Sequence, residues 1–120
     1  MRLNSLVLYT TVLPEMVAFY CHHFGYRVLH DPSDRITELC PPGDGVVLML
    51  HPAAKGQRPG QVLVKLVVSV PDAEAARASL LAQGVAVGPV HTADGYGFAN
   101  LKDPAQNSVS LSSRAFRKVL

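Results

Sequence analysis

The chain has 120 residues, of which 48% are hydrophobic and 17% are charged. Its 11 Lys and Arg residues and 9 Asp and Glu residues give a net charge of +2, without the basic stripe that a nucleic-acid backbone requires. We therefore expect one domain over 1–120, with a core that needs no disulfide or metal, and no nucleic-acid partner.

The cysteines and the apolar runs indicate a cytoplasmic protein. Cys21 and Cys40 are too few for a disulfide scaffold and lack the CxxC spacing, so we expect reduced thiols. The longest apolar runs, 46–50 and 62–70, are strand-sized and far shorter than the roughly 20 residues of a membrane span. We expect no signal peptide and no membrane partner.

The first half of the chain predicts a strand, a helix and three further strands. Residues 3–9 are rich in branched and aromatic side chains, which favours a strand. Pro14 suits the first turn of a helix, in which apolar residues recur every three or four positions until Gly25 ends it. Further strands are predicted at 26–30, 35–40 and 46–51. Residues 1–51 thus form a predicted βαβββ module.

The second half repeats this order. The apolar strand pattern at 66–68 lies sixty positions after the one at 6–8, and Asp72 can cap a helix. Gly84 ends that helix fifty-nine positions after Gly25. Further strands are predicted at 85–90, 95–101 and 108–112. The predicted boundaries are a linker over 52–60, a second module over 61–112 and a basic tail over 113–120.

This duplication predicts an α+β fold. Each βαβββ module has one apolar sheet face that cannot remain in water, so the two modules must pair. We expect them to form a curled mixed sheet around a cavity, because ligands tend to occupy the cleft between repeats.

Several short motifs occur in the order found in a known family. They are Phe19-Tyr20 with Phe24-Gly25, Val70-Pro71-Asp72, Gly84, Tyr96-Gly97 and Asp103-Pro104-Ala105-Gln106-Asn107. Together they span nearly the whole chain, and the sequence resembles the vicinal oxygen chelate superfamily. This superfamily groups glyoxalase I, extradiol dioxygenases and bleomycin-resistance proteins. The resemblance implies the fold described above and, in the metal enzymes of the family, one divalent ion held by four inward-facing His, Glu or Gln side chains.

The resemblance places those four positions at Ser5, Met49, Lys65 and Ser110. A protonated lysine has no lone pair and repels a cation, while hydroxyls and a thioether are poor substitutes for imidazoles and carboxylates. We therefore expect no metal and no cofactor. A shift of the alignment by one residue would restore only His51 as a ligand.

The remaining candidates each have a functional and a structural interpretation. Lys65 is either a buried or semi-buried cation that binds a ligand anion or acts as a base, or a surface side chain at a strand end. His51 is a base or hydrogen-bond donor at the cavity mouth, or a solvated residue before a proline. Tyr9, Phe98 and Tyr96 either stack on a planar ligand or belong to the sheet core.

These observations predict a metal-free member of the superfamily that binds a small organic molecule. Drug or metabolite sequestration, and hence antibiotic resistance, is what the resemblance to the bleomycin-resistance branch implies. We also expect a homodimer, in which the modules pair either within a chain or across the dimer. The alternative is a glyoxalase-like lyase or isomerase, or a dioxygenase-type enzyme, acting on a small carbonyl or aromatic compound. The predicted ligand-binding residues are Ser5, Tyr9, Met49, His51, Lys65, Phe98 and Ser110.

Overall fold

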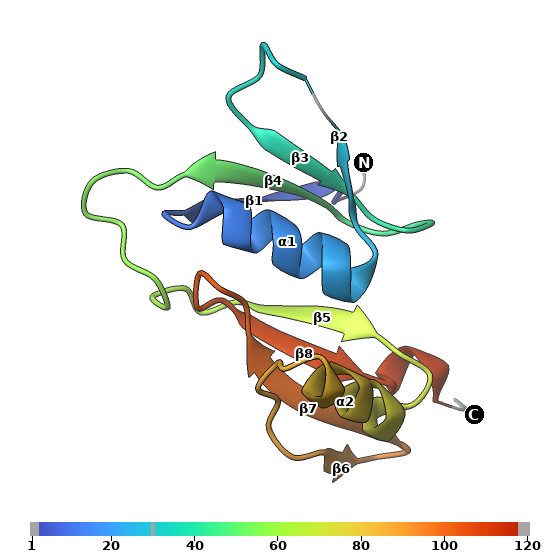
Figure 1. Ribbon diagram of the computed structural model, residues 1–120. Helices are drawn as coiled ribbons and strands as arrows, with labels where there is room; N and C mark the ends of the chain where they lie inside the picture. Colours follow the sequence, from blue (N-terminus) through green and yellow to red (C-terminus); the bar gives the residue numbers. More distant parts are fainter. Residues whose placement is uncertain (1–2, 30, 118–120) are drawn as a thin grey trace. The chain divides into compact units, whose positions relative to one another are not determined.

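The computed structural model describes residues 3–29 and 31–117. The chain forms two compact units, Met1–Pro59 and Gly60–Leu120, and the boundary lies at the end of the predicted linker. Each unit has its own sheet and its own α-helix (Figure 1). The predicted α+β class and the duplicated βαβββ order are therefore confirmed.

The first unit contains a four-stranded mixed sheet and one helix. Its elements are β1 (Ser5–Thr10), α1 (Leu13–Phe24), β2 (Arg27–Leu29), β3 (Thr37–Cys40) and β4 (Val47–Pro52). The strand order is β1-β4-β3-β2. β1 runs parallel to β4, and the other neighbours are antiparallel. The parallel pair requires a crossover, which α1 provides together with β2 and β3.

Local chemistry accounts for both ends of α1. The Thr10 hydroxyl accepts a hydrogen bond from the Val12 amide at 2.9 Å before the helix begins, and Pro14 occupies its first turn. Gly25 ends the helix in the left-handed conformation, with φ 72°, as predicted. Side chains from α1, β3 and β4 form the core of the unit: Met16, Phe19, Tyr20, Leu39, Leu48 and Leu50.

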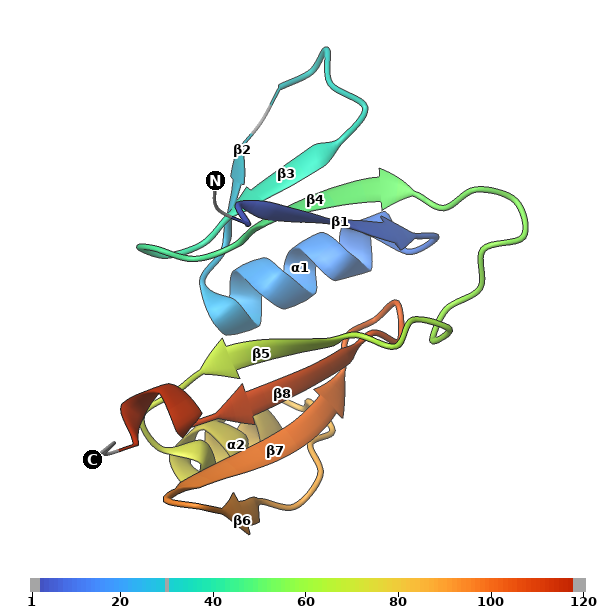
Figure 2. The ribbon, with the colours of Figure 1, turned by 180° about the vertical axis from the view of Figure 1, so that it is seen from behind.

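The second unit repeats the topology. Its elements are β5 (Lys65–Ser69), α2 (Ala73–Ala82), β6 (His91–Ala93), β7 (Tyr96–Lys102), β8 (Ser108–Ser112) and the short 3₁₀ helix η1 (Arg114–Phe116). The strand order is β5-β8-β7-β6, so β5 and β6 are the outer strands (Figure 2). β5 runs parallel to β8, as β1 does to β4.

A cap and a tight turn stabilise this second unit. The Asp72 carboxylate accepts a hydrogen bond from the Ala75 amide at 3.1 Å, which confirms the predicted N-cap of α2. Between β7 and β8, the buried Asp103 carboxylate accepts bonds from the backbone amides of Ala105 and Asn107, both at 2.9 Å. This turn sets the register of the two central strands of the sheet.

The strand predicted at 85–90 was wrong in position, and the apolar run over 62–70 is longer than the strand that it contains. Residues 62–64 lie outside β5, because β8 begins opposite Lys65 and offers the preceding residues no partner. The strand predicted at 85–90 is replaced by β6, since Val87 forms only an isolated bridge with Leu101 and Pro89 has no amide to donate.

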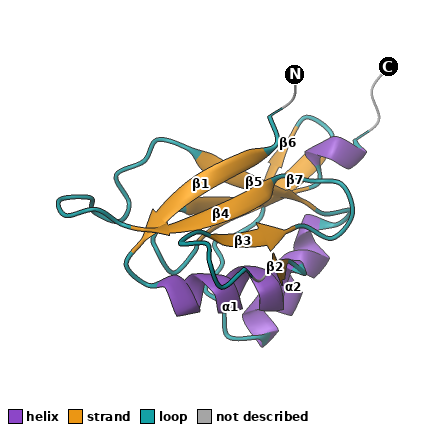
Figure 3. Cartoon of the chain, turned by 90° about the horizontal axis from the view of Figure 1, so that it is seen from above, coloured by secondary structure: helices purple, strands orange, loops and turns teal. Residues whose placement is uncertain are grey.

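The ends of two predicted elements lie outside the described residues: His30 of the strand 26–30 and residues 118–120 of the tail. In the ranges that are described, no helix is long and apolar enough to cross a bilayer. The helices and the strands of the two units are distinguished in Figure 3.

Candidate functional site

Each sheet has one face covered by its α-helix and one face opposite, called here the far face. Residues paired across neighbouring strands point to the same side, and successive residues alternate. Leu48 and Leu50 are buried beneath α1, so Met49 and His51 point to the far face of the first sheet. In the second sheet Val109 and Leu111 are buried with α2, which places Ser110 on its far face.

Tyr9 and His51 lie side by side on the far face of the first sheet. They are register partners in β1 and β4, with ring centroids 5.4 Å apart at 59°. Val7 pairs with Met49 in the next far-face position, and the side chains of Val7 and Tyr9 are 39% and 51% exposed. Ser5 occupies the far-face position at the start of β1. The first sheet therefore presents apolar and aromatic side chains on its far face, with Ser5 and His51 beside them and Glu38 of β3 paired with Met49 on the same side.

Lys65 begins the far face of the second sheet, and its ammonium donates a hydrogen bond to the Asn100 side-chain oxygen at 3.0 Å. Ser110 lies between their strands, paired with Val67 on one side and with Asn100 on the other. Lys65 is exposed, so the structure does not support a buried cation at this position. Sequence reasoning missed Asn100, although its alternation with Phe98 in β7 was a usable signal.

Phe98 lies on the same far face but away from Lys65. It pairs with Ser112, whereas Lys65 pairs with Ser108 at the opposite end of β8. These rows are four positions apart along β8, which corresponds to about 13 Å along the strand. Phe98 instead contacts His91 of β6, with ring centroids 5.2 Å apart at 34°. The seven predicted ligand residues thus divide into four on the first sheet and three at two places on the second.

The two cysteines lie in the first unit. Both Cys21 and Cys40 are free thiols, as expected. Burial raises the pKa of the Cys21 thiol, which lowers its thiolate fraction at neutral pH.

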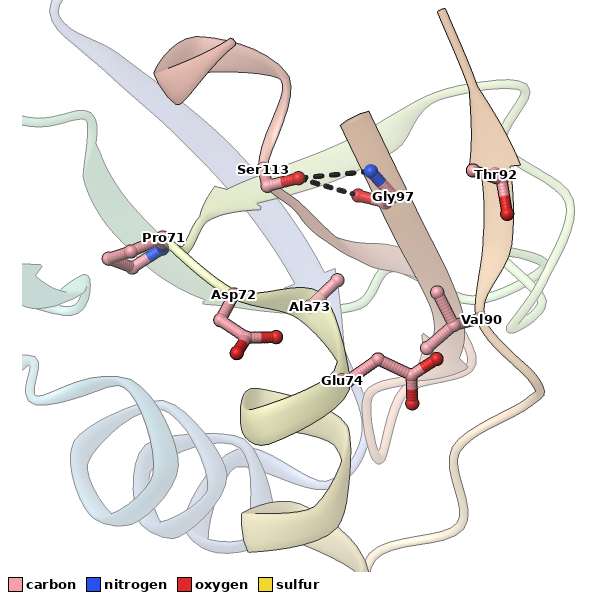
Figure 4. A pocket seen from close by; sticks show the side chains of 8 residues that line it. All are labelled: Pro71, Asp72, Ala73, Glu74, Val90, Thr92, Gly97 and Ser113. Atoms are coloured by element: carbon pink, nitrogen blue, oxygen red, sulfur yellow. Dashed lines mark hydrogen bonds between the residues drawn. The ribbon is translucent and has the colours of Figure 1, made fainter. Parts of the chain in front are cut away.

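A separate pocket of about 350 Å³ opens at the start of α2 (Figure 4). Asp72 and Glu74 face it from the helix, and Ser113 bonds across it to the backbone of Gly97. The Asp72 carboxylate is the cap of α2, and the Ser113 hydroxyl joins η1 to β7. The Asp72 carboxylate and the Ser113 hydroxyl therefore have structural roles at this pocket.

The sequence matches the glyoxalase/bleomycin resistance protein/dioxygenase superfamily over residues 2–111, which is nearly the entire chain. The chain belongs to this superfamily. No curated protein matches the sequence.

Solved structures of the superfamily share the fold. TnmS3, an antibiotic binding protein from Streptomyces sp. CB03234, is 22% identical with a TM-score of 0.77, and the match covers 92% of this chain and 93% of that chain. A glyoxalase/bleomycin resistance protein from the same organism is 25% identical with a TM-score of 0.70, covering 90% and 97%. A lactoylglutathione lyase from Agrobacterium tumefaciens is 19% identical with a TM-score of 0.70, covering 92% of each chain.

The four positions that the resemblance assigned to a metal are matched in the two sheets. In the first sheet Met49 of β4 pairs with the β1 residue that lies two places after Ser5. In the second sheet Ser110 of β8 pairs in the same way with the β5 residue that lies two places after Lys65. All four are far-face positions, and they supply two hydroxyls, a thioether and an ammonium. This donor set does not fit a divalent ion of the superfamily's metal enzymes. Within the described ranges, no three His, Cys, Asp or Glu residues form a group that could hold a metal.

Proposed function

We propose that this protein binds a small organic molecule without a metal ion, through the far faces of its sheets. The observation that carries the proposal is the chemistry of the four matched positions. Ser5, Met49 and Ser110 are uncharged. Lys65 places a positive charge where a bound metal ion would need a side chain with a lone pair. Such residues suit the recognition of a ligand that is largely apolar and carries an acceptor or a negative charge.

The far face of each sheet offers its own contacts to a ligand. Val7, Tyr9 and Met49 offer apolar and aromatic area on the first sheet. On the second sheet the Lys65 ammonium is oriented by Asn100 and retains further donors for a ligand oxygen. In ligand sites generally, apolar area supplies affinity and a few polar groups supply orientation.

The antibiotic-binding structure with the same fold supports a sequestering role for this chain. TnmS3 is described as an antibiotic binding protein. We extend that role here to drug or metabolite sequestration by a cytoplasmic homodimer.

Native mass spectrometry of the protein as purified tests the proposal, together with elemental analysis after dialysis. We expect an organic mass on the folded protein and no stoichiometric Zn, Ni, Mn or Fe. A divalent metal retained at one per chain would refute the side-chain argument. Empty monomers would contradict both ligand binding and the homodimer.

A variant pair tests the role of Lys65. Lys65→Met should lower the occupancy of a co-purified acidic molecule and leave the fold intact, because the side chain is exposed. Lys55→Met, a change of the same charge in the exposed linker, is the control and should retain full occupancy. Equal occupancy of an acidic molecule in both variants would exclude Lys65 from the binding surface.

A further inference from the structure

A cluster of two arginines and three aromatic rings lies at the end of the second sheet that is remote from Lys65. The guanidinium carbons of Arg114 and Arg117 lie 5.2 and 5.9 Å from the centre of the Tyr96 ring. Tyr96 and Phe98 have ring centroids 6.2 Å apart at 35°, and Phe98 in turn contacts His91. The three rings therefore form a continuous strip along β6 and β7, with both positive charges at one end of it.

The backbone holds this cluster in place. The Ser113 hydroxyl accepts a hydrogen bond from the Gly97 amide at 3.0 Å, and the Ser113 amide donates to the Gly97 carbonyl at the same distance. The Ser112 hydroxyl accepts from the Arg114 amide at 3.1 Å. These bonds fasten the start of η1 to β7 directly beside Tyr96.

The two positive charges have no acidic partner in the part of the chain that the structure describes. Neither Arg114 nor Arg117 forms an ion pair there, and the only side-chain hydrogen bond of either residue in that range runs from Arg117 Nη1 to the Arg114 carbonyl at 3.5 Å. Asp94, in the turn between β6 and β7, is the nearest acid along the chain from Tyr96 and is exposed. Two guanidinium groups beside one ring repel each other, and an anion between them would relieve that repulsion.

The aromatic rings that the arginines do not cover offer a stacking surface for a ligand. Phe98 is partly exposed and His91 is exposed, and both lie on the far face. A flat ring of a ligand can stack on them while its anionic group reaches the guanidinium groups. We propose that Tyr96, Phe98, His91, Arg114 and Arg117 form a binding site for a small planar aromatic anion.

This site is distinct from the surface around Lys65. Tyr96 and Lys102 are the two ends of β7, which spans about 20 Å, and Lys65 lies in the row of Lys102. The inference therefore goes beyond the proposed function and can fail without it.

Titration of the full chain with 2-naphthoate tests the inference, followed by amide chemical shifts in ¹H–¹⁵N spectra. We expect saturable binding with the largest shifts in β6, the start of β7 and η1. Cyclohexanecarboxylate lacks the aromatic ring system and 2-naphthamide lacks the charge, so each should bind at least about tenfold more weakly. Added salt should weaken the binding of 2-naphthoate.

Matched variants locate the binding. The double variant Arg114→Gln/Arg117→Gln should weaken 2-naphthoate at least about tenfold. The control Arg35→Gln/Arg58→Gln removes the same charge from exposed loops of the first unit and should change the affinity less than about twofold. The spectrum of each variant reports whether it is folded, and the two single variants replace the double variant if it is not.

Three results would overturn the inference. The first is the absence of saturable 2-naphthoate binding, and the second is equal binding of all three compounds. The third is binding that Lys65→Gln weakens while the double arginine variant does not. This last result would place the anion at the Lys65 surface and leave the proposed function standing.

Discussion

Removal of the Asp103 carboxylate should destabilise the second unit more than any other single change in a turn. Asp103 is 1% exposed, and its carboxylate accepts hydrogen bonds from the amides of Ala105 and Asn107 and from Asn107 Nδ2 at 2.8 Å. A hydrogen bond to a charged group contributes about 1.5 to 3 kcal/mol, and the carboxylate itself is costly to bury. The net loss expected for Asp103→Ala is about 3 kcal/mol, a large share of a total of roughly 5–15 kcal/mol.

The conservative variant Asp103→Asn separates the contribution of the backbone hydrogen bonds from that of the bond to the Asn107 side chain. Asp103→Asn keeps one oxygen for the two backbone amides, but its NH₂ group would face the Asn107 side-chain donor. We expect Asp103→Asn to lose about 1 to 2 kcal/mol, between the wild type and the alanine variant.

Urea unfolding followed by circular dichroism measures both losses as shifts of the midpoint at constant slope. Hydrogen exchange should show lost protection at the amides of Ala105 and Asn107 in the alanine variant. Asp94→Ala, in the exposed turn between β6 and β7, is the control and should stay within about 0.5 kcal/mol of the wild type. A loss below about 0.5 kcal/mol for Asp103→Ala would refute the reasoning.

Two further predictions concern single hydrogen bonds. The Tyr26 hydroxyl donates to the Val46 carbonyl at 2.9 Å, so Tyr26→Phe should cost about 1 kcal/mol in urea unfolding at neutral pH. Burial raises the pKa of Tyr26 above its ordinary value of 10.0, so the stability that Tyr26 contributes is lost as the pH rises above that value. The Phe variant should therefore lose less stability than the wild type at high pH. Equal losses in the two proteins would contradict this. Asp72→Ala should cost about 1 kcal/mol in the same assay and Asp72→Asn much less, and equal losses would exclude a capping role.

Local sequence signals accounted for the helices and turns. Gly25 ends α1 and Asp72 caps α2 as predicted, because both effects depend on residues within one turn of chain. The candidate site was harder to predict. Alternation along β1 indicates that Ser5 and Tyr9 share a face, but the bond between Lys65 and Asn100 depends on the register of β5, β8 and β7.

The amino-acid sequence by itself determined the α+β class, the duplication and the side chains at the four matched positions, since these follow from periodicity and from residue identity. Only the tertiary structure decided the extent of β5 and the position of β6. Residues 62–64 are apolar yet lie outside β5, and 91–93 form β6 because β7 lies opposite. A strand needs a hydrogen-bonding partner as well as suitable side chains. Tertiary contacts likewise brought Arg114 and Arg117 to Tyr96, an arrangement that spacing along the chain does not encode.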